Sequence, residues 1–193
     1  MATSKRDQLV HTAQALFARE GYHATGIDRI LAESGVAKMT LYKHFRSKDE
    51  LILAVLESRQ QIALDLLASA LQGLAPREAL LRIFDGLHVW IHEQDFCGCS
   101  FINAAAEFQS REHPIHQQAA AFKQAFAAFF RQHLLALGVA EVEALTNQLQ
   151  FLLEGALSMA HLQGPGEQAL QAKAAARVLL DAAVPESVAA QQS

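Results

Sequence analysis

The sequence predicts an all-α protein of about nine helices, with a three-helix N-terminal domain followed by a larger helical body. Apolar residues recur at helical spacing along most of the chain, Ala, Leu and Gln dominate, and only four of 193 residues are proline. Hydrophobic residues make up 51% of the chain, which argues against disorder. No apolar run reaches the roughly 18–20 residues that span a bilayer, and no signal-like segment follows the N-terminus, so we expect a cytoplasmic protein.

The first predicted helix covers residues 4–20. Ser4 and Asp7 are spaced like an N-terminal cap, and Gly21 is a stop signal. Four apolar residues at helical spacing form its buried face: Leu9, Ala13, Leu16 and Phe17.

Two short helices follow, joined by a tight turn. Thr25 and Asp28 are spaced like a capping box at the start of the first one, which ends at Gly35. The second begins at about Lys38, and its buried stripe consists of Leu41 and Phe45. Two short helices around a glycine-containing turn are the signature of a helix-turn-helix motif. A short helix with exposed Lys, Thr and Tyr side chains fits a major groove about 12 Å wide.

A long fourth helix begins after Ser47, which forms a capping box with Glu50. Lys48 lies in its first turn, where the macrodipole disfavours a cation, so a phosphate partner would explain this position. Thr25 is likewise expected to cap a helix N-terminus whose N–H groups favour a phosphate. Residues 1–50 carry a net charge of +2 and the remainder −6, as expected if only the first part faces DNA.

Four segments of the first 55 residues form a specific pattern: Phe17–Tyr22, Thr25–Ile27, Ser34–Phe45 and Ser47–Leu51. Together they resemble the tetracycline-repressor (TetR/AcrR) family. The resemblance implies a helix-turn-helix DNA-binding domain over residues 1–47, a helical ligand-sensing and dimerisation domain over 48–185, and a tail over 186–193.

The resemblance also implies DNA contacts in and around the second short helix, from Thr25, Lys38, Thr40, Tyr42, Lys43, His44 and Lys48. The chain departs from the family pattern at Ala37, where a capping Ser is usual, and at Met39, where a small residue is usual. Met39 joins the predicted contacts because an apolar side chain can touch a thymine methyl group. The alternative for this segment is a three-helix protein-interaction module.

Six helices are predicted in the body, at 48–72, 76–93, 100–109, 113–137, 141–163 and 167–183, separated by Gly and Pro. The last two carry apolar stripes with small residues, and the resemblance implies that they form a four-helix interface with a partner chain. The predicted dimer contacts are Phe151, Gly155, Met159, Val178 and Leu179. A dimer presents two reading helices to a palindromic operator.

Aromatic residues gather in the middle of the chain. A largely apolar cavity among helices, with a few polar groups, is the default ligand site. The predicted ligand contacts are Trp90, Phe101, Asn103, Phe108, Phe122, Phe126, Glu154 and His161. The alternative is that each aromatic side chain only packs in the core.

The cysteines allow a second mode of sensing. Cys97 and Cys99 are too close in sequence for an ordinary structural disulfide, and a thiolate at a helix N-terminus is stabilised by the macrodipole. The opposing interpretation is a small buried hydrophobe in a turn. A metal-responsive variant would use nearby histidines, which are His88, His92, His113 and His116. No metal-site spacing rule is met in full, and we expect neither a metal nor a cofactor.

The sequence contains no phosphate loop, dinucleotide fingerprint or nucleophile elbow, so we expect no enzymatic activity. The expected function is a homodimeric, ligand-binding transcriptional repressor that a small-molecule effector releases from a palindromic DNA operator. The alternative is a thiol- or metal-responsive repressor that senses through Cys97, Cys99 and nearby histidines. In either case the long fourth helix is the expected lever between the two domains.

Overall fold

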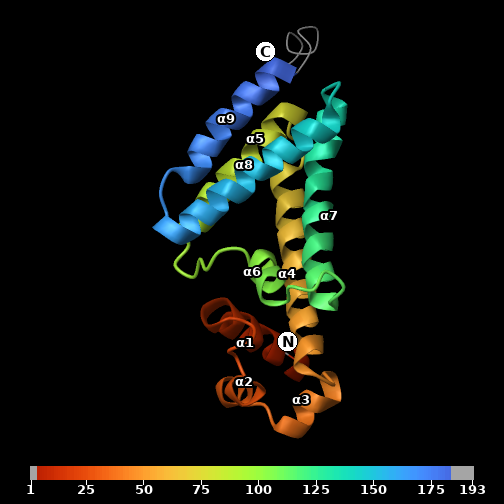
Figure 1. The fold of residues 1–193 in the computed structure, drawn as a ribbon, viewed down its shortest axis with the longest axis vertical. Helices are drawn as coiled ribbons and strands as arrows, with labels where there is room; N and C mark the ends of the chain where they lie inside the picture. Colours follow the sequence, from red (N-terminus) through yellow and green to blue (C-terminus); the bar gives the residue numbers. More distant parts are fainter. Residues whose placement is uncertain (1–3, 184–193) are drawn as a thin grey trace. The chain divides into compact units, whose positions relative to one another are not determined.

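The computed structural model describes residues 4–183, and helices are the only regular secondary structure in that range (Figure 1). The all-α prediction is confirmed. The helices, in chain order, are α1 (Lys5–Glu20), α2 (Ile27–Ser34), α3 (Lys38–His44), α4 (Lys48–Leu71), α5 (Pro76–Ile91), α6 (Ser100–Glu107), α7 (Pro114–Ala136), α8 (Val142–Gln163) and α9 (Gln168–Ala183). The predicted helices agree with these within about two residues at each end, and the predicted tail lies outside the described residues.

The described chain forms two compact units. The first contains residues 4–63 and 100–122, and the second contains residues 64–99 and 123–183. Helices α4 and α7 each begin in the first unit and end in the second. No helix in the described range is long and apolar enough to cross a membrane.

In the first unit, α1 packs against α2 and α3 around an apolar core. Ser4 is the N-cap of α1, and its Oγ accepts a hydrogen bond of 3.1 Å from the Asp7 N–H. Gly35 ends α2 with φ 64°, a left-handed conformation that costs glycine little. The side chains that close this core are completely or almost completely buried: Leu9, Leu16, Phe17, Ile30, Leu41 and Phe45.

The two predicted capping boxes have different outcomes. Ser47 caps α4 as expected, since its Oγ accepts a hydrogen bond of 3.1 Å from the Glu50 N–H. The box at Thr25 is wrong, because the N-cap of α2 is Gly26, without a side-chain cap. The Thr25 hydroxyl instead donates to the Gly21 carbonyl oxygen at 2.7 Å, and this bond closes the turn between α1 and α2.

In the second unit, α9 packs against both α5 and α8. The buried face of α9 is built from small residues, namely Ala169, Ala172 and Ala176, together with Leu180. Small side chains let helices approach closely, so the interface depends on backbone proximity as much as on large apolar groups. The ion pair between Lys173 and Asp85 also ties α9 to α5, with Nζ–Oδ distances of 2.6 and 2.7 Å.

Candidate nucleic-acid interface

Helix α3 exposes almost all of its side chains. Leu41 is its one fully buried residue, whereas Met39 is 74% and Tyr42 46% exposed. Lys38, Lys43 and His44 are also exposed, and Thr40 is half-buried. Ala37, the N-cap, makes no side-chain capping bond, so the first turn of α3 leaves its N–H groups free of a side-chain cap. The helix thus presents cationic, aromatic and apolar groups around a single anchor.

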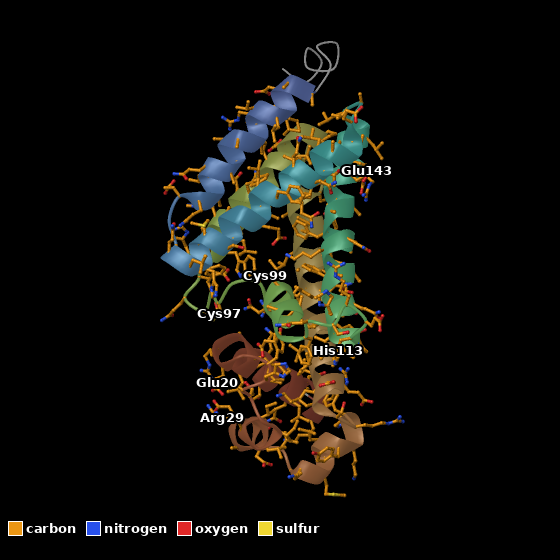
Figure 2. All side chains as sticks on the ribbon, in the orientation of Figure 1. Glu20, Arg29, Cys97, Cys99, His113 and Glu143 are labelled. Carbon is orange, nitrogen blue, oxygen red and sulfur yellow. The ribbon has the colours of Figure 1, made fainter. Side chains whose placement is uncertain are left out.

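Two cationic side chains in and beside α3, Lys38 and Arg29, differ in how strongly they are paired with carboxylates. Lys38 pairs with Asp28 at 3.3 Å, but both side chains are largely exposed, so a phosphate can replace this partner at little cost. Arg29 contacts Glu33 at 2.8 Å and Glu20 at 3.3 Å, and Figure 2 shows Glu20 at the end of α1 beside Arg29 of α2. The hydrogen bond that Arg29 donates to Glu33 and the charge of Glu20 raise the pKa of Arg29 above its ordinary value. Arg29 thus links α2 to α1 through Glu20, while its bond to Glu33 stays within α2.

Lys48 has a partner within the protein. Its Nζ donates a hydrogen bond of 3.1 Å to the carbonyl oxygen of His23. Burial lowers the pKa of Lys48, and the charges of Glu107 and Asp49 oppose this shift. The hydrogen bond to His23 gives Lys48 a partner within the protein at the position where the sequence predicts a phosphate contact.

The same turn is held from α6. The Glu107 carboxylate accepts hydrogen bonds from the N–H groups of Tyr22, at 2.8 Å, and His23, at 2.6 Å. Nε2 of His23 lies 2.9 Å from the Glu107 carbonyl oxygen, and the Tyr22 hydroxyl donates to the Ser100 carbonyl oxygen at 2.9 Å. Both ends of α6 are therefore bound to the α1–α2 turn. Sequence reasoning missed this connection, because no local signal marks partners 85 positions apart.

Thr25 occupies the interior of this turn. It is 0% exposed, and its hydroxyl is used by Gly21. Through this hydrogen bond, Thr25 stabilises the loop before α2. The uncapped N–H groups at the start of α2 are what a phosphate would meet there.

The predicted ligand contacts fall in both units. In the first unit, Phe101 and Phe122 are buried and stacked with ring centroids 3.8 Å apart, and Phe108 is buried between the rings of His23 and His113. Asn103 on the same helix as Phe101 is half-buried. The structure thus brings Phe101 and Phe122 together as a packed pair.

In the second unit, Trp90 packs edge-on against Phe96 at 5.5 Å, and Phe96 meets the ring of His161 at 6.3 Å. The ring centroids of Phe126 and Phe130 lie 6.0 Å apart. Glu154 pairs with Lys123 through Oε1 at 2.5 Å, while its buried Oε2 has no hydrogen-bond partner among the described residues. That oxygen is a polar group available to a bound molecule.

The cysteine segment lies in the loop after α5 (Figure 2). Cys97 is half-buried and Cys99 is buried. Gly98 between them has φ 77°, and a Cβ added there would lie 2.9 Å from Cγ of His161. This loop is therefore packed tightly against α8.

The four histidines named for the metal-responsive alternative contact other rings, a carboxylate or a backbone carbonyl group. The rings of His88 and His92 lie 4.6 Å apart, Nε2 of His113 lies 3.5 Å from Asp49 Oδ2, and Nδ1 of His116 lies 2.9 Å from the Phe108 carbonyl oxygen. Residues 4–183 contain no group of three or more His, Cys, Asp or Glu side chains that could hold a metal ion. The metal-responsive alternative gains no support from this part of the chain.

The predicted dimer contacts lie on an exposed apolar surface of α8 and α9. Phe151 is 71% and Val178 68% exposed, Met159 and Gly155 are exposed, and Leu179 is half-buried. Leu162, which sequence reasoning did not include, extends this surface at the end of α8. Exposed apolar residues of this size on two helices that pack together are typical of an interaction surface.

The sequence is similar to known regulators over its N-terminal part. The family described as "Bacterial regulatory proteins, tetR family" matches residues 9–55. The transcriptional activator FasR of Mycolicibacterium smegmatis is 51% identical over 53 residues, which cover 28% of this chain and 24% of FasR. The family match covers the helix-turn-helix segment and the start of α4.

Two further relatives extend over most of the chain. The HTH-type transcriptional regulator YxaF of Bacillus subtilis is 30% identical over 151 residues, covering 77% of this chain and 78% of YxaF. The crystal structure of a TetR-family regulator from Streptomyces coelicolor superimposes with a TM-score of 0.88 at 30% identity, covering 93% of this chain and 95% of that one. The chain therefore belongs to the TetR family of DNA-binding, non-enzymatic transcriptional regulators.

Proposed function

We propose that the protein is a homodimeric repressor that binds a palindromic operator through α3 and leaves it when a small molecule binds the helical body. The observation that carries the proposal is the composition of α3. One buried side chain, Leu41, fixes the helix, while Lys38, Met39, Tyr42, Lys43 and His44 are exposed. Such a helix gains little from its own protein core, and its exposed groups match the phosphates and base edges of a major groove.

The predicted domain boundaries are part of this proposal. Residues 1–47 read the operator, and residues 48–185 sense the effector and form the dimer. Of the predicted contacts, Lys38, Lys43 and His44 suit phosphates, and Met39, Thr40 and Tyr42 suit base edges or thymine methyl groups. Lys48 and Thr25 act at the edge of this surface by holding the turn before α2.

The dimer forms through α8 and α9. Two reading helices per dimer match a two-fold operator, and the exposed Phe151, Met159 and Val178 supply apolar area for such an interface. Gly155 lies between Phe151 and Met159 and lets the partner helix approach closely.

Release follows from a shift between two conformations. An effector that binds the body more tightly in the conformation with misaligned reading helices draws the dimer away from DNA. The unpartnered Glu154 Oε2 and the aromatic residues of the body supply contacts for such an effector. Operator binding must then weaken effector binding by the same factor.

Fluorescence anisotropy tests this proposal, using full-length protein, the DNA immediately upstream of its own gene, an unrelated duplex and two salt concentrations. We expect tight, salt-sensitive binding that prefers the upstream duplex. Small molecules, an oxidant and zinc are then screened for release, which separates an apolar effector from a thiol or metal signal. Equal, weak binding to both duplexes contradicts autoregulation, and no binding at low salt contradicts the operator proposal itself.

A further inference from the structure

A groove between α5 and α9 gathers the positive charge of the second unit. Its volume is about 330 Å³, and its lining consists of Ala75, Arg77, Glu78, Leu81, Arg82, Asp85, Lys173 and Arg177. The volume lies at the lower end of the range for small-molecule pockets.

The charge of this groove is opposite to that of its surroundings. Residues 64–99 and 123–193 contain six Lys and Arg side chains, of which four line the groove, and 11 Asp and Glu side chains, of which two do. The lining therefore carries a net charge of +2 within a segment of net charge −5. A cleft lined by an excess of one sign of charge attracts ligands of the opposite sign, so this lining favours an anion.

The four cationic side chains of the groove differ in how strongly they are paired with carboxylates. Lys173 is held by Asp85 at 2.6 and 2.7 Å, and Arg77 is paired with Asp181. Arg82 contacts Glu78 at 3.4 Å with both side chains about half exposed, which is a weak ion pair. Arg177 forms no ion pair with any residue in the described range. Two guanidinium groups are thus available, and guanidinium groups bind phosphate and carboxylate groups in a bidentate manner.

The groove lies away from the apolar surface of α8 and α9. Successive residues in an α-helix are rotated by about 100°, so Lys173 and Arg177 are separated from Val178 and Leu179 by about 100–160° around α9. A dimer formed through Val178 and Leu179 therefore leaves the groove accessible.

We infer that the α5–α9 groove is a binding site for a small molecule carrying two or more phosphate or carboxylate groups, with Arg177 and Arg82 as its primary contacts. Leu81, which is buried, forms the apolar floor, and the Lys173–Asp85 and Arg77–Asp181 pairs hold the two helices in place beneath the ligand. This site is independent of the effector contacts proposed above.

Isothermal titration calorimetry on the full-length protein tests the inference, with pyrophosphate and citrate as probes at constant ionic strength. We expect saturable binding of at least one probe with a Kd of about 1 mM or tighter, and at least tenfold weaker binding by Arg177→Gln and by Arg82→Gln. Preference for pyrophosphate assigns a phosphate compound, and preference for citrate assigns a polycarboxylate.

Arg131→Gln is the matched control. Arg131 lies on α7, outside the groove, and makes an exposed pair with Glu143, so its loss changes the net charge equally. Circular dichroism establishes that the variants are folded. The inference is overturned if neither probe binds saturably, if Arg177→Gln and Arg82→Gln bind as tightly as the unchanged protein, or if Arg131→Gln weakens binding to the same extent.

Discussion

The carboxylate of Glu107 accepts hydrogen bonds from the backbone N–H groups of Tyr22, at 2.8 Å, and His23, at 2.6 Å. The last residue of α6 thereby acts as the acceptor for a turn that has no regular secondary structure of its own. Charge-assisted hydrogen bonds are stronger than neutral ones, so this pair of bonds contributes substantially to the order of the α1–α2 turn.

Glu107→Ala should lower the free energy of unfolding by about 1–3 kcal/mol, because the part-buried N–H of Tyr22 and the exposed N–H of His23 both lose their acceptor. Glu107→Gln should cost less, since its single amide oxygen can still accept from one of them. Urea unfolding monitored by circular dichroism measures both. Glu112→Gln, an exposed carboxylate between α6 and α7, is the control, and equal unfolding free energies for all three variants would contradict the role of Glu107.

Tyr42→Ala should weaken operator binding by roughly 1–3 kcal/mol if the side chain reads a base. Lys43→Ala should weaken binding to all DNA sequences and reduce the slope of log K against log salt by about 2, because the dimer loses one phosphate contact in each protomer. Both are measured by anisotropy at several salt concentrations. Neither should change the oligomeric state, because both side chains are exposed on α3. Unchanged operator affinity would remove the residue concerned from the proposed interface, and Arg131→Ala in the second unit supplies the baseline.

Gly155→Arg should convert the dimer to a monomer. A Cβ at Gly155 meets nothing within 4 Å, so the single chain accommodates the new side chain and the disruption falls on the partner. Light scattering after size-exclusion chromatography measures the mass.

Gly86→Arg is the matched control for this experiment. Gly86 lies inside α5, and a Cβ there also meets nothing within 4 Å. Both substitutions replace a helical glycine by a better helix former, which favours the helix by roughly 0.5–1 kcal/mol. A dimeric Gly155→Arg variant would place the interface elsewhere, as would equal dissociation of both variants.

The lowered pKa of Lys48 predicts a pH dependence of stability. Burial disfavours the ammonium form, so the folded chain releases this proton at a lower pH than the unfolded chain, whose ordinary value is 10.5. Within the window that opens at the lowered pKa and closes at 10.5, the unfolded state binds more protons, and the contribution of Lys48 to the free energy of unfolding rises with pH.

The difference in unfolding free energy between the unchanged protein and Lys48→Gln should therefore increase as the pH rises through this window. Urea titrations at several alkaline pH values measure it, with Lys43→Gln as the control at an exposed position. A difference that stays constant or falls with rising pH would contradict the assigned cause of the shift.

Gly98→Ala should destabilise the second unit by more than about 1 kcal/mol, since alanine is strained at φ 77° and its Cβ would lie 2.9 Å from the His161 ring. Adding His161→Ala should recover the steric part of this loss and leave the backbone part. Thermal unfolding monitored by calorimetry compares the single and double variants. Full recovery of stability by His161→Ala would contradict the backbone part, because the positive φ at position 98 would then add nothing to the destabilisation.

The sequence predicts those features of the fold that depend on local signals. Ser4, Ser47 and Gly35 mark helix ends because capping and positive φ are properties of a few consecutive residues. The sequence predicts the wrong partner for Thr25, because a threonine hydroxyl can bond either a following N–H or a preceding carbonyl, and only the path of the turn decides between them.

The connections made by α6 show what local signals cannot reveal. The bond between Tyr22 and Glu107 joins positions far apart in the chain, and nothing near either residue specifies the other. The same holds for Lys173 and Asp85, which meet because α9 packs on α5. For the candidate site, residue types on α3 could be predicted, whereas the exposure of Met39 and the burial of Thr25 follow from tertiary packing.

Leu41 is the one buried residue of α3, and this affects how the DNA preference of such a regulator can evolve. The stability of the helix-turn-helix segment depends on Leu41, on Phe45 and on the contacts of the α1–α2 turn. The exposed side chains of α3 contribute little to this stability. Replacement of Met39, Tyr42 or Lys43 is therefore nearly free of a folding penalty. Target preference can diverge by a few substitutions on one short helix while the scaffold is inherited unchanged.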